Sequence, residues 1–444
     1  MALMVGVSGV RGLVGQTLTP ELVLEFARAY GTFLDGGQVV LARDSRPSGP
    51  MYAAAAAAGL LAAGCQVTDL GVAMTPTVGR TIIEGKYAGG ISITASHNPA
   101  PWNGLKFFTN LGFGPSAEDA RQIAHIRDQR SFRDVQTGFS APQADREASQ
   151  RHVRAVLAAR EVDTSALRGT KVVLDSVNGA GCEHSPALLK GFGIDLVHIN
   201  AEPTGDFAHP PEPLRENLSQ LCQTVRTTRA AIGFAQDPDA DRLAIVDENG
   251  TYIGEEYTLA LAVESVLSRR PGPVAANLST SRMVDDIAAR YGVKVIRTPV
   301  GEAHVAAAML QAGCVVGGEG NGGVIDPRIC NVRDSLSAMS LVLQLLAATG
   351  KTVSELVAAL PCYASIKQKF ACPRDRIQAA VSAVTAKFAD YNPTTTDGVR
   401  VDFPAGWVHV RASNTEPIIR IIAEADSMAA ADELVKQVRQ VAGV

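Results

Sequence analysis

The chain lacks paired cysteines, long apolar runs and a strong excess of charge, and each absence excludes a class of protein. Its 7 cysteines are scattered and form no C-x-x-C pair, so we expect neither a disulfide framework nor a zinc site. The apolar stretch at 53–64 is too short to span a membrane, and the first residues do not resemble a signal peptide. The net charge of −4 is unlike that of a nucleic-acid-binding protein. We therefore expect a cytoplasmic protein with no nucleic-acid partner and no membrane partner.

Two common catalytic motifs are also missing. The nucleophile-elbow pattern G-x-S-x-G does not surround the best candidate nucleophile, Ser96, which disfavours acyl transfer. The pattern G-x-x-x-x-G-K-[ST] does not occur, which disfavours a P-loop kinase. The chemistry must therefore rest on other segments.

Short β-branched segments alternate with longer helical patterns along most of the 444 residues. We expect strands at 39–42, 91–94, 172–175, 232–235, 295–298 and 314–316, and helices at 20–35, 51–64, 117–129, 145–160, 256–269, 280–291, 302–312 and 334–349. This alternation predicts α/β layers in which helices cover the strands. Similar strand–turn–helix units at 41–49, 174–181 and 277–283 suggest three related α/β domains.

The end of the chain has a different pattern. Two expected strands, 407–411 and 418–423, surround a polar turn and are followed by a helix at 427–441, which predicts a small α+β domain. A polar stretch near 130–145, a hairpin-like segment near 254 and the segment 361–372 mark the boundaries. The expected domains are therefore 1–150, 151–254, 255–366 and 367–444.

Ser96 lies in the first segment that carries chemistry. The sequence Thr94-Ala95-Ser96-His97-Asn98-Pro99 follows an apolar strand, and Lys106 comes shortly after it. Ligands of open α/β sheets bind at the carboxyl ends of strands. A serine beside a histidine and a lysine can accept a phosphoryl or acyl group. The alternative is a turn in which serine and asparagine satisfy the backbone.

Three aspartates form the second segment, where Asp237, Asp239 and Asp241 alternate on a turn and Arg242 follows them. Alternating carboxylates can converge on one hard cation, and Mg²⁺ is typically bound by few carboxylates together with phosphate oxygens. The alternative is a solvated acidic loop. An EF-hand is excluded because Arg242 occupies the sixth position, where that loop needs glycine.

Two further loops are rich in ligand-binding residue types. The glycine-rich loop 317–323 contains Glu319 and Asn321, which can hydrogen-bond sugar hydroxyls. It matches G-x-G-x-x-G only formally, because no helix follows it directly. The loop 411–420 places hydroxyl, amide and backbone N–H groups between arginines, which suits a phosphate dianion. Purely structural turns remain the alternative for both loops.

In this order and at this spacing, the four segments resemble the α-D-phosphohexomutase family, and the resemblance runs from Ser8-Gly9-Val10-Arg11-Gly12 almost to the C-terminus. It implies four domains with mixed sheets around a central cleft. It implies a phosphoserine at Ser96 and an Mg²⁺ site formed by a phosphate oxygen of Ser96 with the three aspartates. The remaining implied site residues are Arg11, His97, Lys106 and Arg242 at the catalytic centre, Glu319 and Asn321 for the sugar, and Arg411, Ser413, Asn414, Thr415 and Arg420 for the phosphate.

The resemblance also implies a reaction. A sugar phosphate is the expected partner, a hexose 1,6-bisphosphate the expected activator, and the enzyme is expected to be a monomer or a homodimer. The sequence leaves open whether His97 or Lys106 handles protons. Asn321-Gly322-Gly323 replaces the Ser-Gly-His of many bacterial members, which favours glucosamine phosphate over glucose or mannose phosphate as the substrate. A metal-dependent phosphatase and a non-catalytic sugar-phosphate-binding protein are the alternatives from other classes.

Overall fold

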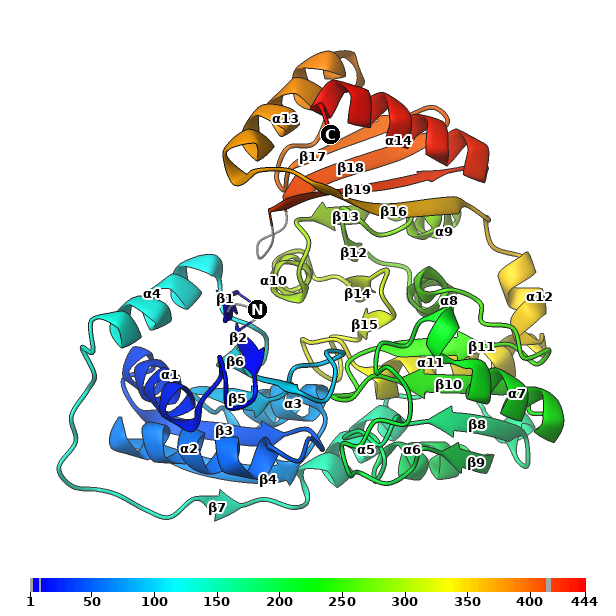
Figure 1. Ribbon diagram of the computed structural model, residues 1–444. Helices are drawn as coiled ribbons and strands as arrows, with labels where there is room; N and C mark the ends of the chain where they lie inside the picture. Colours follow the sequence, from blue (N-terminus) through cyan, green and yellow to red (C-terminus); the bar gives the residue numbers. More distant parts are fainter. Residues whose placement is uncertain (1–2, 8, 413–416) are drawn as a thin grey trace.

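The computed structural model describes residues 3–7, 9–412 and 417–444. The described chain forms three α/β units and a fourth unit with an antiparallel sheet (Figure 1). The first and second units lie side by side, the third lies above the second, and the fourth lies on the third. Among the described residues, none of the helices combines the length and the apolar character that a membrane crossing requires.

The first unit is built around a seven-stranded mixed sheet. Its elements are β1 (Met4–Gly6), β2 (Gly9–Leu13), α1 (Pro20–Phe33), β3 (Gly37–Arg43), α2 (Gly49–Ala62), β4 (Cys65–Val72), α3 (Thr75–Gly85), β5 (Gly89–Ile93), β6 (Trp102–Thr109), α4 (Ala117–Asp128) and β7 (Gln143–Ala144). The strand order is β1-β2-β6-β5-β3-β4-β7. The apolar stretch at 53–64 is confirmed as a helix within the protein, where α2 packs against α1. That contact needs Gly59, because a Cβ there would lie 2.3 Å from the carbonyl oxygen of Leu24.

The second and third units share one smaller plan. The second contains α5 (Ala148–Ala158), β8 (Lys171–Asp175), α6 (Ser185–Gly191), β9 (Asp195–Ile199), α7 (Ser219–Thr228), β10 (Ile232–Gln236) and β11 (Leu243–Val246), with short 3₁₀ turns at Ser165–Leu167 and Arg215–Asn217. The third contains α8 (Glu255–Leu267), β12 (Val274–Asn277), α9 (Met283–Arg290), β13 (Val295–Thr298), α10 (Glu302–Ala312), β14 (Val316–Glu319), β15 (Gly323–Ile325), α11 (Ser335–Thr349) and α12 (Val353–Ala358). Each sheet has three parallel strands and one antiparallel edge strand, in the orders β11-β10-β8-β9 and β13-β12-β14-β15.

One hairpin recurs in all three sheets. β5, β10 and β14 each pair in parallel with an earlier strand, namely β3, β8 and β12, and pair antiparallel with the strand that follows them. The loop between the two strands of each hairpin therefore lies at the carboxyl end of a parallel strand, which is the edge where α/β sheets bind ligands. This common plan bears out the expectation of three related α/β units with mixed sheets.

The fourth unit contains β16 (Ala364–Ala371), α13 (Arg374–Lys387), a 3₁₀ turn at Ala389–Tyr391, β17 (Val399–Phe403), β18 (Gly406–Ala412), β19 (Ile418–Ala425) and α14 (Met428–Ala442). Its four strands are all antiparallel, in the order β16-β19-β18-β17. Alternate residues such as Val410, Ile419 and Ile421 are buried in one core with α13 and α14, so both helices cover the same face of the sheet. The opposite face is turned toward the third unit (Figure 1).

The main error among the expected strands concerns 314–316. The strand is β14, Val316–Glu319, and it includes Gly317 and Gly318, which the sequence analysis placed in a loop. Both glycines are buried in the sheet, where a Cβ on Gly317 would lie 2.7 Å from the carbonyl oxygen of Ala275 and one on Gly318 2.1 Å from that of Gly323. Glycine is therefore needed here for close packing of the backbone, not for a turn.

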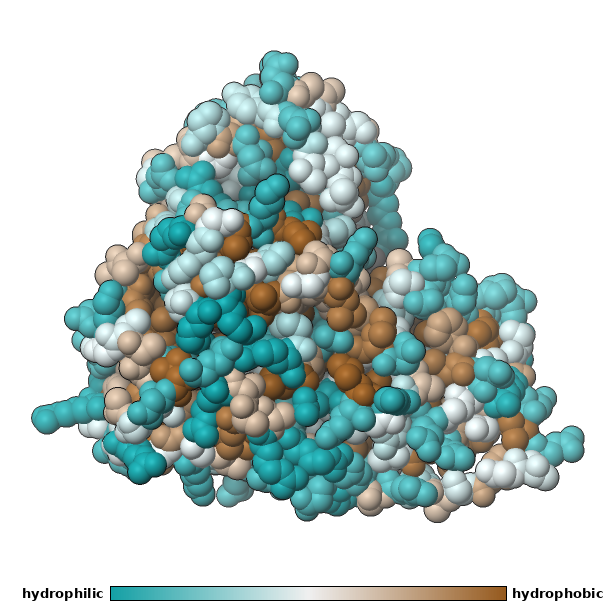
Figure 2. Space-filling view, turned by 180° about the vertical axis from the view of Figure 1, so that it is seen from behind, coloured by the Kyte–Doolittle hydropathy of each residue, from teal (hydrophilic) through white to brown (hydrophobic). Residues whose placement is uncertain are grey.

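On the back of the molecule, hydrophilic side chains alternate with scattered hydrophobic ones (Figure 2).

Candidate active site

Ser96 lies in the loop between β5 and β6, in a strained turn. Its φ is +51°, in the left-handed region that residues other than glycine rarely adopt, and its side chain is buried. The turn is held by Thr94, whose Oγ1 accepts a hydrogen bond from the N–H of Ser96 at 2.9 Å. Such strain persists only where the surroundings over-determine it. The Ser96 hydroxyl is therefore fixed in one place by the loop.

Arg46 supports the same loop, and the sequence analysis did not predict this residue. The side chain is fully buried and its Nε lies 3.0 Å from Oδ2 of Asp44. Its guanidinium donates to the carbonyl oxygens of Ser96 at 2.7 Å and Asn98 at 2.6 Å, and also to those of Pro99 and Trp102. One buried arginine thus satisfies four carbonyls of the serine loop, where an unpaired buried carbonyl would be costly.

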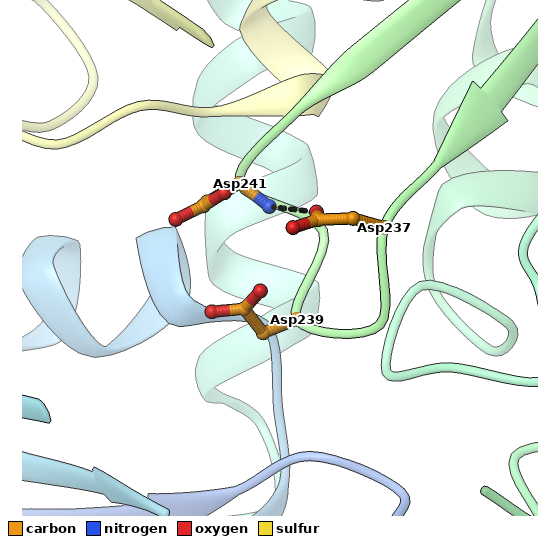
Figure 3. A group of neighbouring side chains, drawn as sticks. All are labelled: Asp237, Asp239 and Asp241. Atoms are coloured by element: carbon orange, nitrogen blue, oxygen red, sulfur yellow. Dashed lines mark hydrogen bonds between the residues drawn. The ribbon is translucent and has the colours of Figure 1, made fainter. Parts of the chain in front are cut away.

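The three aspartates lie close together in the loop between β10 and β11, with their carboxylates directed to the same side of it (Figure 3). All three side chains are buried. Each carboxylate offers one oxygen, and these three oxygens all lie within 4.8 Å of one another. Oδ1 of Asp237 accepts the backbone N–H groups of Asp241 and Arg242, both at 3.1 Å, which closes the turn. The Ser96 hydroxyl donates to Oδ2 of Asp237 at 3.1 Å. The structure therefore brings the serine loop and the aspartate loop together from different units.

The charges of this cluster fit a divalent cation. Burial, together with Asp241 and Asp239, raises the pKa of Asp237 well above its usual range. Burial also disfavours the ionised form of Asp241, but the cations of Arg333, Lys106 and Arg242 outweigh it and lower its pKa well below the usual range. Oδ1 of Asp239 and Oδ1 of Asp241 are buried and accept no hydrogen bond within the described structure. Buried carboxylate oxygens without a donor are suited to Mg²⁺, which takes oxygen ligands.

Lys106 and Arg333 neutralise part of the negative charge of the aspartate cluster. Nζ of Lys106 lies 2.7 Å from Oδ2 of Asp239 and 2.8 Å from Oδ2 of Asp241. Arg333 reaches three carboxylates, with Nη2 at 2.7 Å from Asp241, Nη1 at 2.5 Å from Glu319 and Nε at 3.0 Å from Glu302. Arg333 was not predicted, yet it joins the aspartate loop to the glycine-rich loop. A buried arginine in this position supplies the fork of donors that paired carboxylates need.

His97 lies beside Ser96, and the two remaining predicted cations, Arg11 and Arg242, lie near His97. Nδ1 of His97 lies 3.3 Å from the Ser96 hydroxyl, and burial together with Arg242 and Arg11 lowers the pKa of His97 to about 2. Nη1 of Arg11 donates to Oδ1 of Asn98 at 3.2 Å. Arg242 lies 3.6 Å from Glu212, a carboxylate of the loop between β9 and α7 that sequence reasoning also missed. The imidazole beside Ser96 is therefore neutral at ordinary pH.

Glu319 and Asn321 differ in where their side chains point. Glu319 ends β14 and accepts the amide of Asn277 at 2.8 Å, the N–H of Gly301 at 3.1 Å and the guanidinium of Arg333. Oδ1 of Asn321 accepts the N–H of Gly323 at 3.3 Å, so this side chain is turned back onto its own loop. The described contacts therefore connect Glu319, but not Asn321, to the serine and aspartate loops.

The predicted phosphate residues lie in the fourth unit, apart from the serine and aspartate loops. Arg411 on β18 and Arg420 on β19 are directly opposite each other, and Nε of Arg411 lies 3.2 Å from Asp397. Ser413, Asn414 and Thr415 lie outside the described residues. Among the described residues, no hydrogen bond or ion pair joins Arg411 or Arg420 to the serine and aspartate loops.

Comparison with known proteins agrees with this arrangement. Family models for phosphoglucomutase/phosphomannomutase match the chain in order, as alpha/beta/alpha domain I over 2–134, domain II over 150–250, domain III over 254–363 and the C-terminal domain over 368–441. A "probable phosphoglucosamine mutase" of Methanopyrus kandleri is 40% identical over 97% of this chain and 95% of its own. A "phosphoglucomutase/phosphomannomutase" of Thermococcus kodakarensis is 38% identical over 96% of this chain and 95% of its own.

A solved structure shows the same architecture. The crystal structure of a phosphoglucomutase/phosphomannomutase family protein from Burkholderia thailandensis superimposes with a TM-score of 0.87 at 27% identity, covering 99% of this chain and 98% of that one. The likeness thus extends over all four units rather than a single domain. The chain therefore belongs to the phosphoglucomutase/phosphomannomutase family, the α-D-phosphohexomutases, and is an isomerase of that family.

Proposed function

We propose that the chain is a phosphoglucosamine mutase, which interconverts glucosamine 6-phosphate and glucosamine 1-phosphate through a phosphoserine at Ser96. The observation that carries the proposal is the hydrogen bond of 3.1 Å between the Ser96 hydroxyl and Asp237. It places a candidate phosphoryl acceptor against a buried cluster of three carboxylates that originates in another unit. Phosphoryl transfer depends on positioning and on charge neutralisation: the serine loop supplies the positioning, and a cation held by the three carboxylates would supply the neutralisation.

In this proposal, each of the four domains carries one part of the active site. Domain 1–150 carries the serine loop, 151–254 the metal loop, 255–366 the sugar loop and 367–444 the phosphate loop. Asp237, Asp239, Asp241 and a phosphate oxygen of phospho-Ser96 would hold Mg²⁺, which when bound neutralises charge on the transferring group. In support, an N-acetylphosphoglucosamine mutase of Aspergillus fumigatus was solved in complex with GlcNAc-6P and magnesium, and a serine-to-alanine variant of that enzyme was solved with glucose 1,6-bisphosphate.

We propose the following course for the reaction. Arg411, Arg420 and the loop between them, with Ser413, Asn414 and Thr415, hold the phosphate already on the sugar. The free hydroxyl of the sugar then faces phospho-Ser96 and attacks its phosphorus. The bond between phosphorus and Oγ of Ser96 breaks, and a sugar 1,6-bisphosphate forms. The bisphosphate turns over in the cleft, and its other phosphoryl group returns to Ser96. A free hexose 1,6-bisphosphate activates the enzyme because it phosphorylates Ser96.

Charged and polar side chains around Ser96 take separate parts in this scheme. The proton of the attacking sugar hydroxyl ends on the released Oγ of Ser96, and neutral His97, 3.3 Å from Oγ, hydrogen-bonds this oxygen during the exchange. Asp239 and Asp241 raise the pKa of Lys106 against the effect of burial, so Lys106 remains an ammonium and stabilises negative charge. Arg11 and Arg242 face the transferring group. Glu319 and Asn321 bind sugar hydroxyls in both orientations of the intermediate.

The choice of sugar rests on relatives. Three relatives that are 35–40% identical are named "probable phosphoglucosamine mutase", from Methanopyrus kandleri, Pyrococcus abyssi and Thermococcus kodakarensis. A second candidate function, phosphoglucomutase/phosphomannomutase, is favoured by the 38% identical Thermococcus relative of that name. Both functions use the same serine, metal loop and phosphate loop, and they differ only in the sugar.

Phosphorus NMR tests the proposal directly. The protein receives Mg²⁺, a trace of hexose 1,6-bisphosphate and, in parallel samples, the 1-phosphates of glucosamine, glucose and mannose. We expect the fastest conversion to the 6-phosphate with glucosamine 1-phosphate. A faster reaction with glucose or mannose would retain the mechanism and change the substrate. Release of inorganic phosphate without any 6-phosphate would instead indicate a phosphatase, and binding without turnover a sugar-phosphate-binding protein.

A further inference from the structure

We propose that Lys369 is a third cationic ligand of the phosphate subsite in the fourth domain, beside Arg411 and Arg420. The inference rests on the proposed function, because it takes the phosphate of a sugar phosphate as the ligand. Lys369 lies on β16, outside the loop in which sequence reasoning placed the subsite. It is brought there only by the pairing of strands that are distant in the chain.

The register of three strands sets the three cations in one row. Lys369 of β16 is directly opposite Arg420 of β19, and Arg420 is directly opposite Arg411 of β18. Their neighbours Phe370, Ile419 and Val410 pack into the core under α13 and α14. Because side chains alternate along a strand, the three cations extend from the other face of the sheet. Adjacent strands are about 4.8 Å apart, so long side chains from all three can meet one anion.

That face of the sheet borders the sugar loop. Two residues before Arg411, Nδ1 of His409 lies 2.8 Å from the hydroxyl of Ser279 in the third domain. The next residue, Thr280, accepts the N–H of Gly320 in the sugar loop at 3.0 Å. Two residues before Lys369, the ammonium of Lys367 lies 2.6 Å from Glu255 at the start of α8. On the same three strands, the row of cations therefore lies beside residues that contact the third domain close to the sugar loop.

The row is unfavourable for the protein without an anion. Like charges directly opposite each other on neighbouring strands destabilise a sheet. Arg411 forms an ion pair with Asp397. Neither Lys369 nor Arg420 forms an ion pair with another described residue. Nε of Arg420 is buried and has no hydrogen-bond partner in the described structure. A phosphate dianion would supply acceptors for this nitrogen and for the ammonium of Lys369.

The inference is tested with Lys369→Met, which removes the charge and keeps most of the length, and with Lys369→Arg, which keeps the charge. Lys387→Met is the matched control, since Lys387 is an exposed lysine in the last turn of α13, which covers the opposite face. We expect Lys369→Met to raise the KM for the sugar 1-phosphate and the inhibition constant of inorganic phosphate about 10-fold, the effect of one hydrogen bond to a charged group. The kcat should change little, because the contact is made in ground state and transition state alike.

Thermal unfolding separates binding from a structural role. Without phosphate, Lys369→Met should melt at the same temperature as the wild type or higher, because it relieves repulsion within the row. Equal KM and phosphate inhibition in Lys369→Met, Lys387→Met and the wild type, or failure of Lys369→Arg to restore them, would overturn the inference. Binding of inorganic phosphate to the resting protein, followed by phosphorus NMR line width, needs no turnover. It therefore tests the row even if the proposed reaction proves wrong.

Discussion

Replacement of Arg333 by methionine removes a cation that contacts three carboxylates, the buried Asp241 and Glu319 and the half-buried Glu302. Methionine fills similar space, so the packing loss is small and the electrostatic loss dominates. Removal of one partner of a buried ion pair typically costs about 3–5 kcal/mol, because the remaining charge is left uncompensated. We expect the variant to lose about that much stability in the unfolding transition that includes the third domain. Mutase activity should fall as well, since Glu319 and Asp241 lose the cation that joins them.

The dependence of this loss on Mg²⁺ makes the test specific. Without Arg333 the carboxylate cluster is more negative, so Mg²⁺ should raise the melting temperature of the variant by more than it raises that of the wild type. Scanning calorimetry with and without Mg²⁺ measures both effects. Arg328→Met is the control, because Arg328 pairs with Asp326 and Glu161 but does not touch the aspartate loop. Exposed ion pairs contribute at most about 1 kcal/mol. A smaller loss of unfolding free energy for Arg333→Met would refute the reasoning. An equal effect of Mg²⁺ on the melting temperatures of Arg333→Met and Arg328→Met would also refute it.

Three other substitutions test separate parts of the site. Ser96→Ala should abolish nearly all mutase turnover while its circular dichroism stays native, and ordinary turnover would disprove the phosphoserine. Asp239→Asn should weaken Mg²⁺ binding and activity together, and an unchanged calorimetric Mg²⁺ titration would argue against the metal loop. Burial raises the pKa of Glu256 to about 7, above its unfolded value, so stability from this group is present at low pH and lost as pH rises toward 7. Glu256→Gln should remove that part of the decline between pH 5 and 7, as measured by urea unfolding at several pH values, and an identical decline in both proteins would contradict it.

The parts of the site that could be predicted are those in which the chemistry is local in the chain. Asp237, Asp239 and Asp241 occupy one turn, so their convergence follows from the spacing alone. Ser96 was predicted for a similar reason, since an apolar strand precedes a turn with polar side chains. The prediction for Ser96 also used the rule that ligands of open α/β sheets bind at the carboxyl ends of strands. The hairpins β5–β6 and β10–β11 place these loops at that edge.

Arg46 and Arg333 could not be predicted, because nothing near them in the chain marks their role. Arg46 supports a loop 50 residues farther along the chain, through the carbonyl oxygens of Ser96 and Asn98. Arg333 reaches Asp241, 92 residues away, across the boundary between two domains. An arginine in sequence is usually a solvated surface residue. Only the packing of sheets against one another shows that these two are buried, and burial is what makes their charge matter.

The fourth domain shows why Lys369, unlike the loop 411–420, could not be predicted from a sequence pattern. In the first two domains Ser96 and the three aspartates lie in the loops that follow β5 and β10, so each loop is preceded by an apolar strand. In the antiparallel sheet of the fourth domain, side chains in mid-strand can face a ligand from the flat face. Lys369, Arg420 and Arg411 become neighbours only through the order β16-β19-β18, in which the first strand pairs with the last. A row of cations formed across strands in this way has no contiguous motif, and the repulsion between its like charges is the physical argument behind the proposed phosphate contact.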